Sequence, residues 1–265
     1  MIAVALAATW MGGWPFRVLA AAAAAAMIVE WSDMHRVPRL WAWLGAALLA
    51  AILLAGAEYL YPTGSADWMY DPASGTMVAF VDDQTLSPNW LGFGAVALAA
   101  LVAGLLSRRH AMIGGMVYVG IPSFAMVSLS WVWEVLVLWV FAVTWATDIF
   151  AYFAGRSIGG PKLAPRISPN KTWAGLTGGV AGAAVLGWLV AHAFDLEPIF
   201  RWIGGPMGAI AQAGDLYESW VKRRAGTKDS GTLLPGHGGV LDRLDGLLAV
   251  VLATTLLLMA GLWTG

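Results

Sequence analysis

The chain has 265 residues, of which 59% are hydrophobic and only 12% are charged. A soluble domain carries about 25% charged residues, so the composition excludes an ordinary soluble globule as well as intrinsic disorder. Cysteine is absent from the sequence, which excludes disulfides, thiol catalysis and Cys-ligated zinc. The formal net charge of −1 gives no indication of a nucleic-acid partner. We therefore expect a polytopic membrane protein.

Apolar runs of about 20 residues predict transmembrane helices, because a helix of that length crosses the hydrocarbon core. Such runs lie near residues 15–30, 41–58, 90–106, 112–127, 131–150, 173–191, 199–214 and 244–262. Residues 1–11 form a shorter apolar run before Gly12, Gly13 and Pro15, which suits a half-helix, a truncated start or a kinked first span. The predicted fold is all-α: a polytopic transmembrane helical bundle with eight or nine spans.

Most basic residues fall in alternate loops of this prediction, including 151–172 and 214–245. The loop at 59–89 contains no Lys or Arg but four Asp. The positive-inside rule then places the basic loops in the cytoplasm and 59–89 outside. We predict an N-terminal region of transmembrane helices, 1–130, and a C-terminal catalytic transmembrane region, 131–265. The cytoplasmic loops are expected to form the active site.

Residues with catalytic chemistry concentrate in the loop 214–245. Asp215, Ser219 and Lys222 have the spacing i, i+4, i+7 and would share one face of a helix, as would Asp242 and Asp245 at i, i+3. Carboxylates from two helix ends, joined by phosphate oxygens of a substrate, suit Mg²⁺ better than zinc. The glycine-rich turn at 235–239 can bring backbone amides close to an anion.

Each of these pieces also has a plainer interpretation. Two Asp residues at a helix start are commonly caps, and a basic run beside a span is usually a topology signal. The prolines and basic residues of 151–172 would suit a stiff linker at an anionic lipid surface. Four Asp, one Glu, one His and five basic residues between positions 215 and 245 nevertheless favour a functional site, because charges beside a bilayer are costly.

The order of these residues is more specific than their density. Residues 219–245 read Ser219-x-x-Lys222-Arg223-x-x-x-x-Lys228-Asp229-x-Gly231-x-x-Leu234-Pro235-x-His237-Gly238-Gly239-Val240-x-Asp242-Arg243-Leu244-Asp245. This run resembles the signature of the phosphatidate cytidylyltransferases (CDP-diacylglycerol synthases). The segments Asp148-x-x-Ala151-Tyr152, Ser168-Pro169-x-Lys171, Gly214-Asp215 and Glu30-Trp31 are similar to the same family.

The resemblance implies a nucleotidyltransferase that converts CTP and phosphatidate to CDP-diacylglycerol and pyrophosphate. It implies that the catalytic residues are Asp215, Lys222, Lys228, Asp242 and Asp245. Mg²⁺ would be held by Asp215, Asp242 and Asp245, with Asp229 as a further ligand and with or without a monovalent cation such as K⁺. The substrate-binding residues would be Asp148, Tyr152, Ser168, Asn170, Lys171, Ser219, Arg223, His237, Gly238, Gly239 and Arg243. It further implies a homodimer in a bacterial inner membrane, with its active site facing the cytoplasm.

Alternative functions remain open from the sequence. The chain could be a cytidylyltransferase or a CTP-dependent kinase that acts on another lipid. An ion-coupled transporter would use Glu30, Glu58, Glu134 and Asp148 as a relay, although these residues lie near predicted span ends rather than in mid-bilayer. An intramembrane zinc protease is disfavoured, because the sequence has no His-Glu-x-x-His motif.

Overall fold

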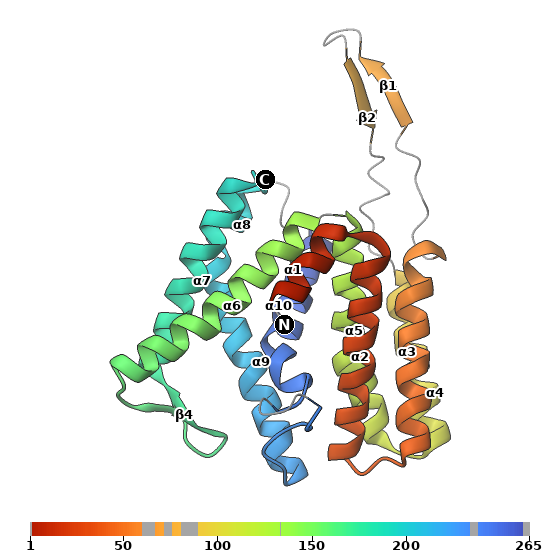
Figure 1. Cartoon of the computed structure of the whole chain (residues 1–265), viewed down its shortest axis with the longest axis vertical. Coiled ribbons are helices and arrows are strands. Elements are labelled where there is room, and N and C mark those ends of the chain that lie inside the picture. Colours follow the sequence, from red (N-terminus) through yellow and green to blue (C-terminus); the bar gives the residue numbers. More distant parts are fainter. Residues whose placement is uncertain are drawn as a thin grey trace.

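Long helices dominate the computed structural model, which describes residues 2–59, 67–71, 76–80, 90–132, 134–233 and 238–261 (Figure 1). The helices are α1 (Ile2–Met11), α2 (Gly13–Met34), α3 (Arg39–Tyr59), α4 (Trp90–Ser107), α5 (His110–Val132), α6 (Glu134–Ser157), α7 (Trp173–Ala193), α8 (Pro198–Trp202), α9 (Gly204–Ala225) and α10 (Leu241–Met259). The predicted all-α character is therefore confirmed for the main body of the protein.

Two short antiparallel hairpins lie between the helices. Strands β1 (Asp67–Asp71) and β2 (Thr76–Phe80) pair within the region predicted as a plain external loop. Strands β3 (Lys162–Ala164) and β4 (Ser168–Thr172) pair between α6 and α7, with an irregular register. The loop prediction was wrong at these two places, because short strands of mixed composition have no hydrophobic period that reveals them.

Five helices within the described ranges are long and apolar enough to cross a membrane: α2, α4, α5, α6 and α7. Helix α1 has 10 residues, so it extends only about 15 Å, half the hydrocarbon thickness. Its length suits the half-helix interpretation of residues 1–11. Helices α9 and α10 carry several charged residues in addition to their apolar segments. The structure thus supports a multi-pass membrane protein, whereas the number of eight or nine spans stays a prediction.

The predicted loops separate into two groups at opposite ends of the bundle. Figure 1 shows the α2–α3 and α4–α5 connections, the β3–β4 hairpin and the C-terminal end of α9 at the lower end. The β1–β2 hairpin and α8 lie at the upper end. This arrangement matches the alternation of basic and acidic loops in the sequence. All candidate site loops therefore belong to one end of the molecule.

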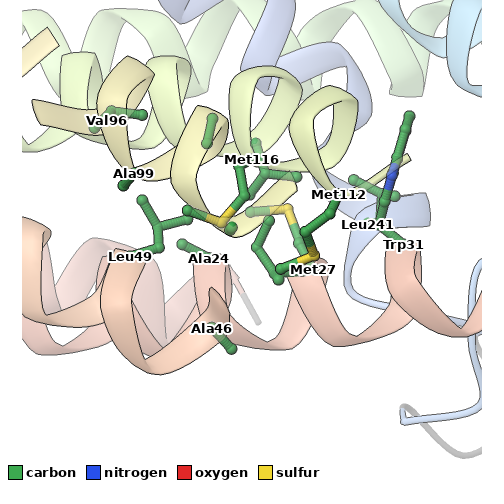
Figure 2. Close-up of a cluster of buried hydrophobic side chains, with 14 of the residues drawn as sticks. Ala24, Met27, Trp31, Ala46, Leu49, Val96, Ala99, Met112, Met116 and Leu241 are labelled. Atoms are coloured by element: carbon green, nitrogen blue, oxygen red, sulfur yellow. The ribbon is translucent and has the colours of Figure 1, made fainter. Parts of the chain in front are cut away.

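The hydrophobic core has two parts. In the first, α2, α3, α4 and α5 pack together, and Figure 2 shows Met27, Leu49 and Met116 from three of these helices in one layer. The second part is centred on α6, α7 and α9 and includes the fully buried Trp139. Helix α10 contributes to both parts, since Leu241 belongs to the first and Val250 and Val251 belong to the second. The proposed division at residue 130 stays a prediction.

The glycines of α7 are used for close packing against α6. A β-carbon at Gly179 would lie 2.9 Å from the carbonyl oxygen of Thr147, and one at Gly182 would meet the ring of Phe150. Small residues allow this approach of two helix backbones. The stripe that includes Gly178, Gly179 and Gly182 therefore packs inside the chain, and it gives no support to a dimer interface.

Candidate active site

Two helices extend further than the predicted spans, and this extension positions the site. Helix α6 continues to Ser157 rather than ending near residue 150, so Asp148 and Tyr152 belong to a helix. Helix α9 continues to Ala225, where Gly226 ends it in the left-handed conformation with φ of 75°. The loops predicted at 151–172 and 214–245 are correspondingly shorter. Hydropathy detects only the apolar part of a helix, so it misses a polar extension into water.

One polar face of α9 carries three of the predicted site residues. Asp215, Ser219 and Lys222 lie on this helix as their spacing predicts. The Ser219 hydroxyl donates to Oδ1 of Asp215 over 3.4 Å. Glu218 lies on the adjoining side of the helix and is buried, with only 1% of its side chain exposed. The helical interpretation of this stretch is therefore confirmed.

The β3–β4 hairpin is joined to α9 by Lys171. Its Nζ atom lies 2.5 Å from Oδ2 of Asp215 and donates to Oε1 of Gln212 over 3.1 Å. The next residue, Thr172, caps α7, because its hydroxyl accepts the N–H of Gly175 at 3.0 Å. The Arg223 side chain also donates to a carbonyl oxygen of the hairpin connection. The two polar regions predicted from the sequence thus meet at Asp215.

Lys222 forms the centre of a second charged group. Its Nζ atom lies 2.7 Å from Oε2 of Glu218 and 2.6 Å from Oδ1 of Asp242. The lysine and Asp242 side chains are each only 12% exposed. One ammonium group therefore joins a carboxylate of α9 to a carboxylate in the first turn of α10. This arrangement fixes the ends of the two helices relative to each other.

Burial and hydrogen bonding act against each other on the pKa values of this group, which lies beyond the predicted span 199–214. Burial favours the neutral form of Asp242, but hydrogen bonds from Lys222 and from the N–H groups of Gly239 and Ser230 outweigh it and lower its pKa. For Lys222, burial is likewise outweighed by its two carboxylate partners, which raise its pKa. Burial raises the pKa of Glu218 to about 7, in spite of its ion pair with Lys222. The Lys222–Asp242 pair is thus charged at neutral pH.

Asp245 lies where α9 and α10 pack closely against each other. A β-carbon at Gly214 would lie 2.9 Å from the carbonyl oxygen of Asp245, so glycine is required there. The Asp245 carboxylate accepts the N–H of Gly246 at 2.7 Å. It is also within electrostatic range of Asp215, Glu218 and Asp148. Three helices, α6, α9 and α10, therefore direct acidic side chains toward one region.

Other predicted residues lie at the edge of this region or away from it. Tyr152 is exposed and interacts with Arg156 on its own helix. Asn170, Lys228, Asp229 and Arg243 are exposed, and Ser168 is half-buried on β4. His237 and the side chain of Glu58 lie outside the described part of the chain. Arg243 is within electrostatic range of Asp148.

Gly238 and Gly239, at the end of the predicted glycine-rich turn, lie against Asp242. Gly238 has a φ of 82°, which favours glycine. A β-carbon at Gly238 would lie 2.7 Å from the Asp242 carboxylate, and the N–H of Gly239 donates to that carboxylate at 2.8 Å. In this structure these glycines bring the backbone to Asp242. Their predicted contact with a phosphate stays untested.

The sequence prediction did not assign a role to Glu218 or Gln212. Glu218 lies four residues before Lys222, which is the spacing of a helical ion pair, so this partner was accessible from the sequence. Gln212 contacts Lys171, which is distant in sequence, and no local pattern indicates that contact.

The donor set of the site has the chemistry of a magnesium site. Carboxylate oxygens are the protein ligands that Mg²⁺ prefers, and Asp215, Asp242 and Asp245 supply them. Within the described residues, however, no three Asp, Glu or His side chains are close enough together to hold a metal ion. Asp215 and Asp242 are instead ion-paired with Lys171 and Lys222. The chemistry fits Mg²⁺, and the ligand set stays a prediction.

A pocket of about 360 Å³ lies between the C-terminal turns of α2 and α9. It is lined by Trp31, His35, Tyr217, Trp220, Val221, Arg224 and Ala225. The Arg224 guanidinium lies 5.0 Å from the centre of the Trp220 ring. Tyr118 stacks at an angle against both Trp31 and Tyr217, with centroid distances of 5.4 and 5.2 Å, and is within electrostatic range of Asp245. The pocket therefore adjoins the acidic region through Tyr118.

The fold and the site define a multi-pass helical membrane protein with paired acidic and basic side chains at one end of its bundle. The chain belongs to the cytidylyltransferase family, whose model matches residues 1–260. A phosphatidate cytidylyltransferase of Brucella abortus is 38% identical, over 91% of this chain and 83% of the relative. The phosphatidate cytidylyltransferase of Haemophilus influenzae is 36% identical, over 79% of this chain and 63% of the relative. That of Pseudomonas aeruginosa is 40% identical, over 48% of this chain and 49% of the relative. The family resemblance inferred from residues 148–250 is therefore confirmed.

Proposed function

We propose that the protein is a phosphatidate cytidylyltransferase, which forms CDP-diacylglycerol and pyrophosphate from CTP and phosphatidate. Membership of the family and the names of its relatives support this reaction. The observation that carries the proposal is the pair of ion-paired groups, Lys171–Asp215 and Glu218–Lys222–Asp242, at one end of a membrane bundle. Such a site suits the joining of a lipid phosphate to a nucleotide.

The reaction needs charge compensation more than it needs a strong base. An oxygen of the lipid phosphate, already anionic at neutral pH, attacks the α-phosphorus of CTP. The bond from that phosphorus to the bridging oxygen breaks, and pyrophosphate leaves with the electron pair. Lys171, Lys222 and Arg223 would hold phosphate oxygens and stabilise the charge on the leaving group. No cysteine or Ser-His pair is required.

Asp215, Asp242 and Asp245 would hold Mg²⁺, with or without a monovalent cation such as K⁺. The metal would neutralise phosphate charge, as it does in other phosphoryl-transfer enzymes. Asp229 is a weaker candidate ligand, because its side chain is exposed beyond the end of α9. Asp215 and Asp242 are ion-paired with Lys171 and Lys222, which keep the two carboxylates oriented.

We place the lipid substrate in the pocket between α2 and α9. Its tryptophan rings suit the interfacial part of a phospholipid, and Arg224 suits its anionic head group. Tyr118 and Tyr217 connect this pocket with the acidic region, so a lipid seated there would have its phosphate near the site.

We further propose that the site faces the cytoplasm at the bacterial inner membrane, where CTP is present. The basic residues of the surrounding loops support this orientation. A homodimer is proposed from the family resemblance alone.

Purified protein incubated with Mg²⁺, labelled CTP and phosphatidate tests the activity directly. We expect labelled CDP-diacylglycerol and an equal amount of pyrophosphate. Release of CDP with no nucleotide on the lipid would identify a kinase, and turnover of only another lipid phosphate would identify a related transferase. Either result, or no turnover, would contradict the proposal.

The Asp245→Asn variant tests the assignment of the site. We expect it to remain folded in the membrane and to lose turnover, since it removes a carboxylate from the acidic region. Asp195→Asn is the matched control, because Asp195 is an exposed residue in the α7–α8 connection that pairs with Arg201. Full activity of Asp245→Asn would remove this residue from the site.

A further inference from the structure

We propose that Glu30 is a positioning residue of the active site, which acts by holding the N-terminal end of α10 and therefore Asp242. This inference rests on the proposed function, because its test measures the turnover of CTP and phosphatidate. Glu30 lies near the C-terminal end of α2, far in sequence from the residues that it contacts. Its side chain is only 5% exposed.

Both carboxylate oxygens of Glu30 accept hydrogen bonds from the chain around the start of α10. Oε1 accepts the N–H of Val240 at 2.8 Å, and Oε2 accepts the N–H of Leu241 at 2.9 Å. The hydroxyl of Ser230 donates to Oε2 at 3.2 Å. We call these four residues, Glu30, Ser230, Val240 and Leu241, the Glu30 cap. Three donors thus compensate the burial of one carboxylate.

The Glu30 cap supplies hydrogen-bond acceptors for the first N–H groups of α10, which the neighbouring side chains do not provide. The first N–H groups of a helix have no partner within it, and they are usually satisfied by the side chain of the N-cap residue. The N-cap of α10 is Val240, which has no side-chain acceptor. A carboxylate from another helix therefore takes this role, and its negative charge also suits the positive end of the helix dipole.

The same contacts determine the position of Asp242. Ser230 uses its hydroxyl on Glu30 and its N–H on Asp242, at 3.1 Å from Oδ2. The N–H of Gly239, the residue before Val240, also donates to Asp242. Chain segments on both sides of residues 234–237 are therefore held between two carboxylates. A shift of Glu30 would displace Asp242 and with it the Lys222 ion pair.

Two glycines leave space for this arrangement. A β-carbon at Gly231 would lie 2.8 Å from Cγ of Glu30, and one at Gly239 would lie 2.5 Å from Oε2 of Glu30. Both distances are shorter than real β-carbon contacts, so a side chain at either position would push against Glu30. The Glu30 cap therefore requires glycine at both positions.

Glu30→Gln tests the proposal, because the amide nitrogen cannot accept one of the two backbone N–H groups. We expect kcat to fall by about 10- to 100-fold, the usual effect of removing a residue that orients a site. The KM for CTP should change less than kcat does, since the hydrogen bonds of Glu30 itself go to Ser230, Val240 and Leu241 and not to a proposed phosphate ligand. Hydrogen exchange of a peptide covering residues 238–245 should become faster, whereas peptides of α6 and α7 keep their rates.

Glu197→Gln is the matched control, because Glu197 is exposed before α8 at the other end of the bundle. It should alter neither kcat nor exchange near α10. Ser230→Ala, which removes one of the three hydrogen bonds, should have an effect smaller than that of Glu30→Gln. If Glu30→Gln fails to fold, Ser230→Ala and Gly239→Ala make the same test with the same two measurements.

Unchanged kcat in folded Glu30→Gln would overturn the proposal. A loss of kcat with unchanged exchange at 238–245 would also overturn it, since Glu30 would then act in another way. These outcomes differ from a failure of the proposed function, in which the wild-type protein itself would not convert CTP and phosphatidate.

Discussion

Lys222 joins two carboxylates that belong to different helices, so we expect its replacement to destabilise the protein strongly. Glu218 and Asp242 would be left buried without their common cation. We expect Lys222→Met to reduce the free energy of unfolding by about 3–5 kcal/mol, as for other broken buried ion pairs. Thermal unfolding in detergent measures this change.

Lys228→Met is the matched control for stability, because Lys228 is exposed and only six residues further along the chain. Its free energy of unfolding should change by less than about 0.5 kcal/mol. Equal effects of the two substitutions would show that the ion pairs of Lys222 contribute no special stability.

At the residue scale, the sequence predicted the local relations and missed the distant ones. The helical spacing of Asp215, Ser219 and Lys222 is a property of neighbouring turns, and it was predicted correctly. Glu30 contacts residues at least 200 positions away, and no local pattern contains that information. The space at Gly239 is limited by Glu30 and Ser230, and the sequence alone did not indicate this contact.

At the scale of elements, the close contact between α6 and α7 depends on glycines of α7. Gly179 lies against Thr147 and Ala151 at distances that leave no room for a methyl group. We expect Gly179→Ala to destabilise the protein by about 1–3 kcal/mol through overpacking. The midpoint of thermal unfolding in detergent should fall accordingly.

Gly94 in α4 offers the opposite case, because nothing lies within 4 Å of a β-carbon built there. Gly94→Ala should leave stability unchanged or raise it by up to about 1 kcal/mol, since alanine favours a helix. A similar loss of stability in Gly179→Ala and Gly94→Ala would mean that α6 and α7 do not pack as described.

The pocket between α2 and α9 leads to a prediction about the lipid substrate alone. Trp220→Ala should raise the KM for phosphatidate, with the KM for CTP unchanged, because Trp220 lines the pocket and belongs to neither of the ion-paired groups. The ring supplies stacking and apolar contact of about 1–3 kcal/mol, so the increase should be roughly 5- to 150-fold. Initial rates at varied phosphatidate in mixed micelles measure it.

Trp188 in α7 is the control, with an exposed fraction of 41% against 39% for Trp220. Both side chains are partly exposed on the bundle, but Trp188 is outside the pocket. If Trp188→Ala has the same effect on the KM for phosphatidate, the change reflects general membrane contact and the pocket is not the lipid site.

The positions of the long helices were predictable, whereas several of their ends were not. Apolar runs at 90–106, 112–127 and 173–191 correspond to α4, α5 and α7. Helix α6 extends seven residues beyond the predicted limit of 150, because Arg156 in its last turn is compatible with a helix end in water. The β3–β4 hairpin depends on pairing across a turn, which composition does not reveal.

At the scale of the whole molecule, the two ends of the bundle should face opposite sides of the membrane. The absence of cysteine makes this easy to test with single substitutions. We expect Glu197→Cys to react with a membrane-impermeant maleimide in intact cells, and Arg166→Cys to react only after the membrane is opened. Both residues are exposed, so accessibility within the protein is not limiting. The reverse pattern would contradict the proposed orientation.

The distance in sequence between the two sides of the Glu30 cap has a consequence for biosynthesis. Helix α2 leaves the ribosome early, whereas Val240 and Leu241 emerge some 200 residues later. A nascent chain that has inserted α9 already carries Asp215 and Lys222, yet it has no partner for Glu30. We therefore expect catalytic competence to arise abruptly, once α10 has been translated, and ribosome-bound intermediates arrested before that point to be inert.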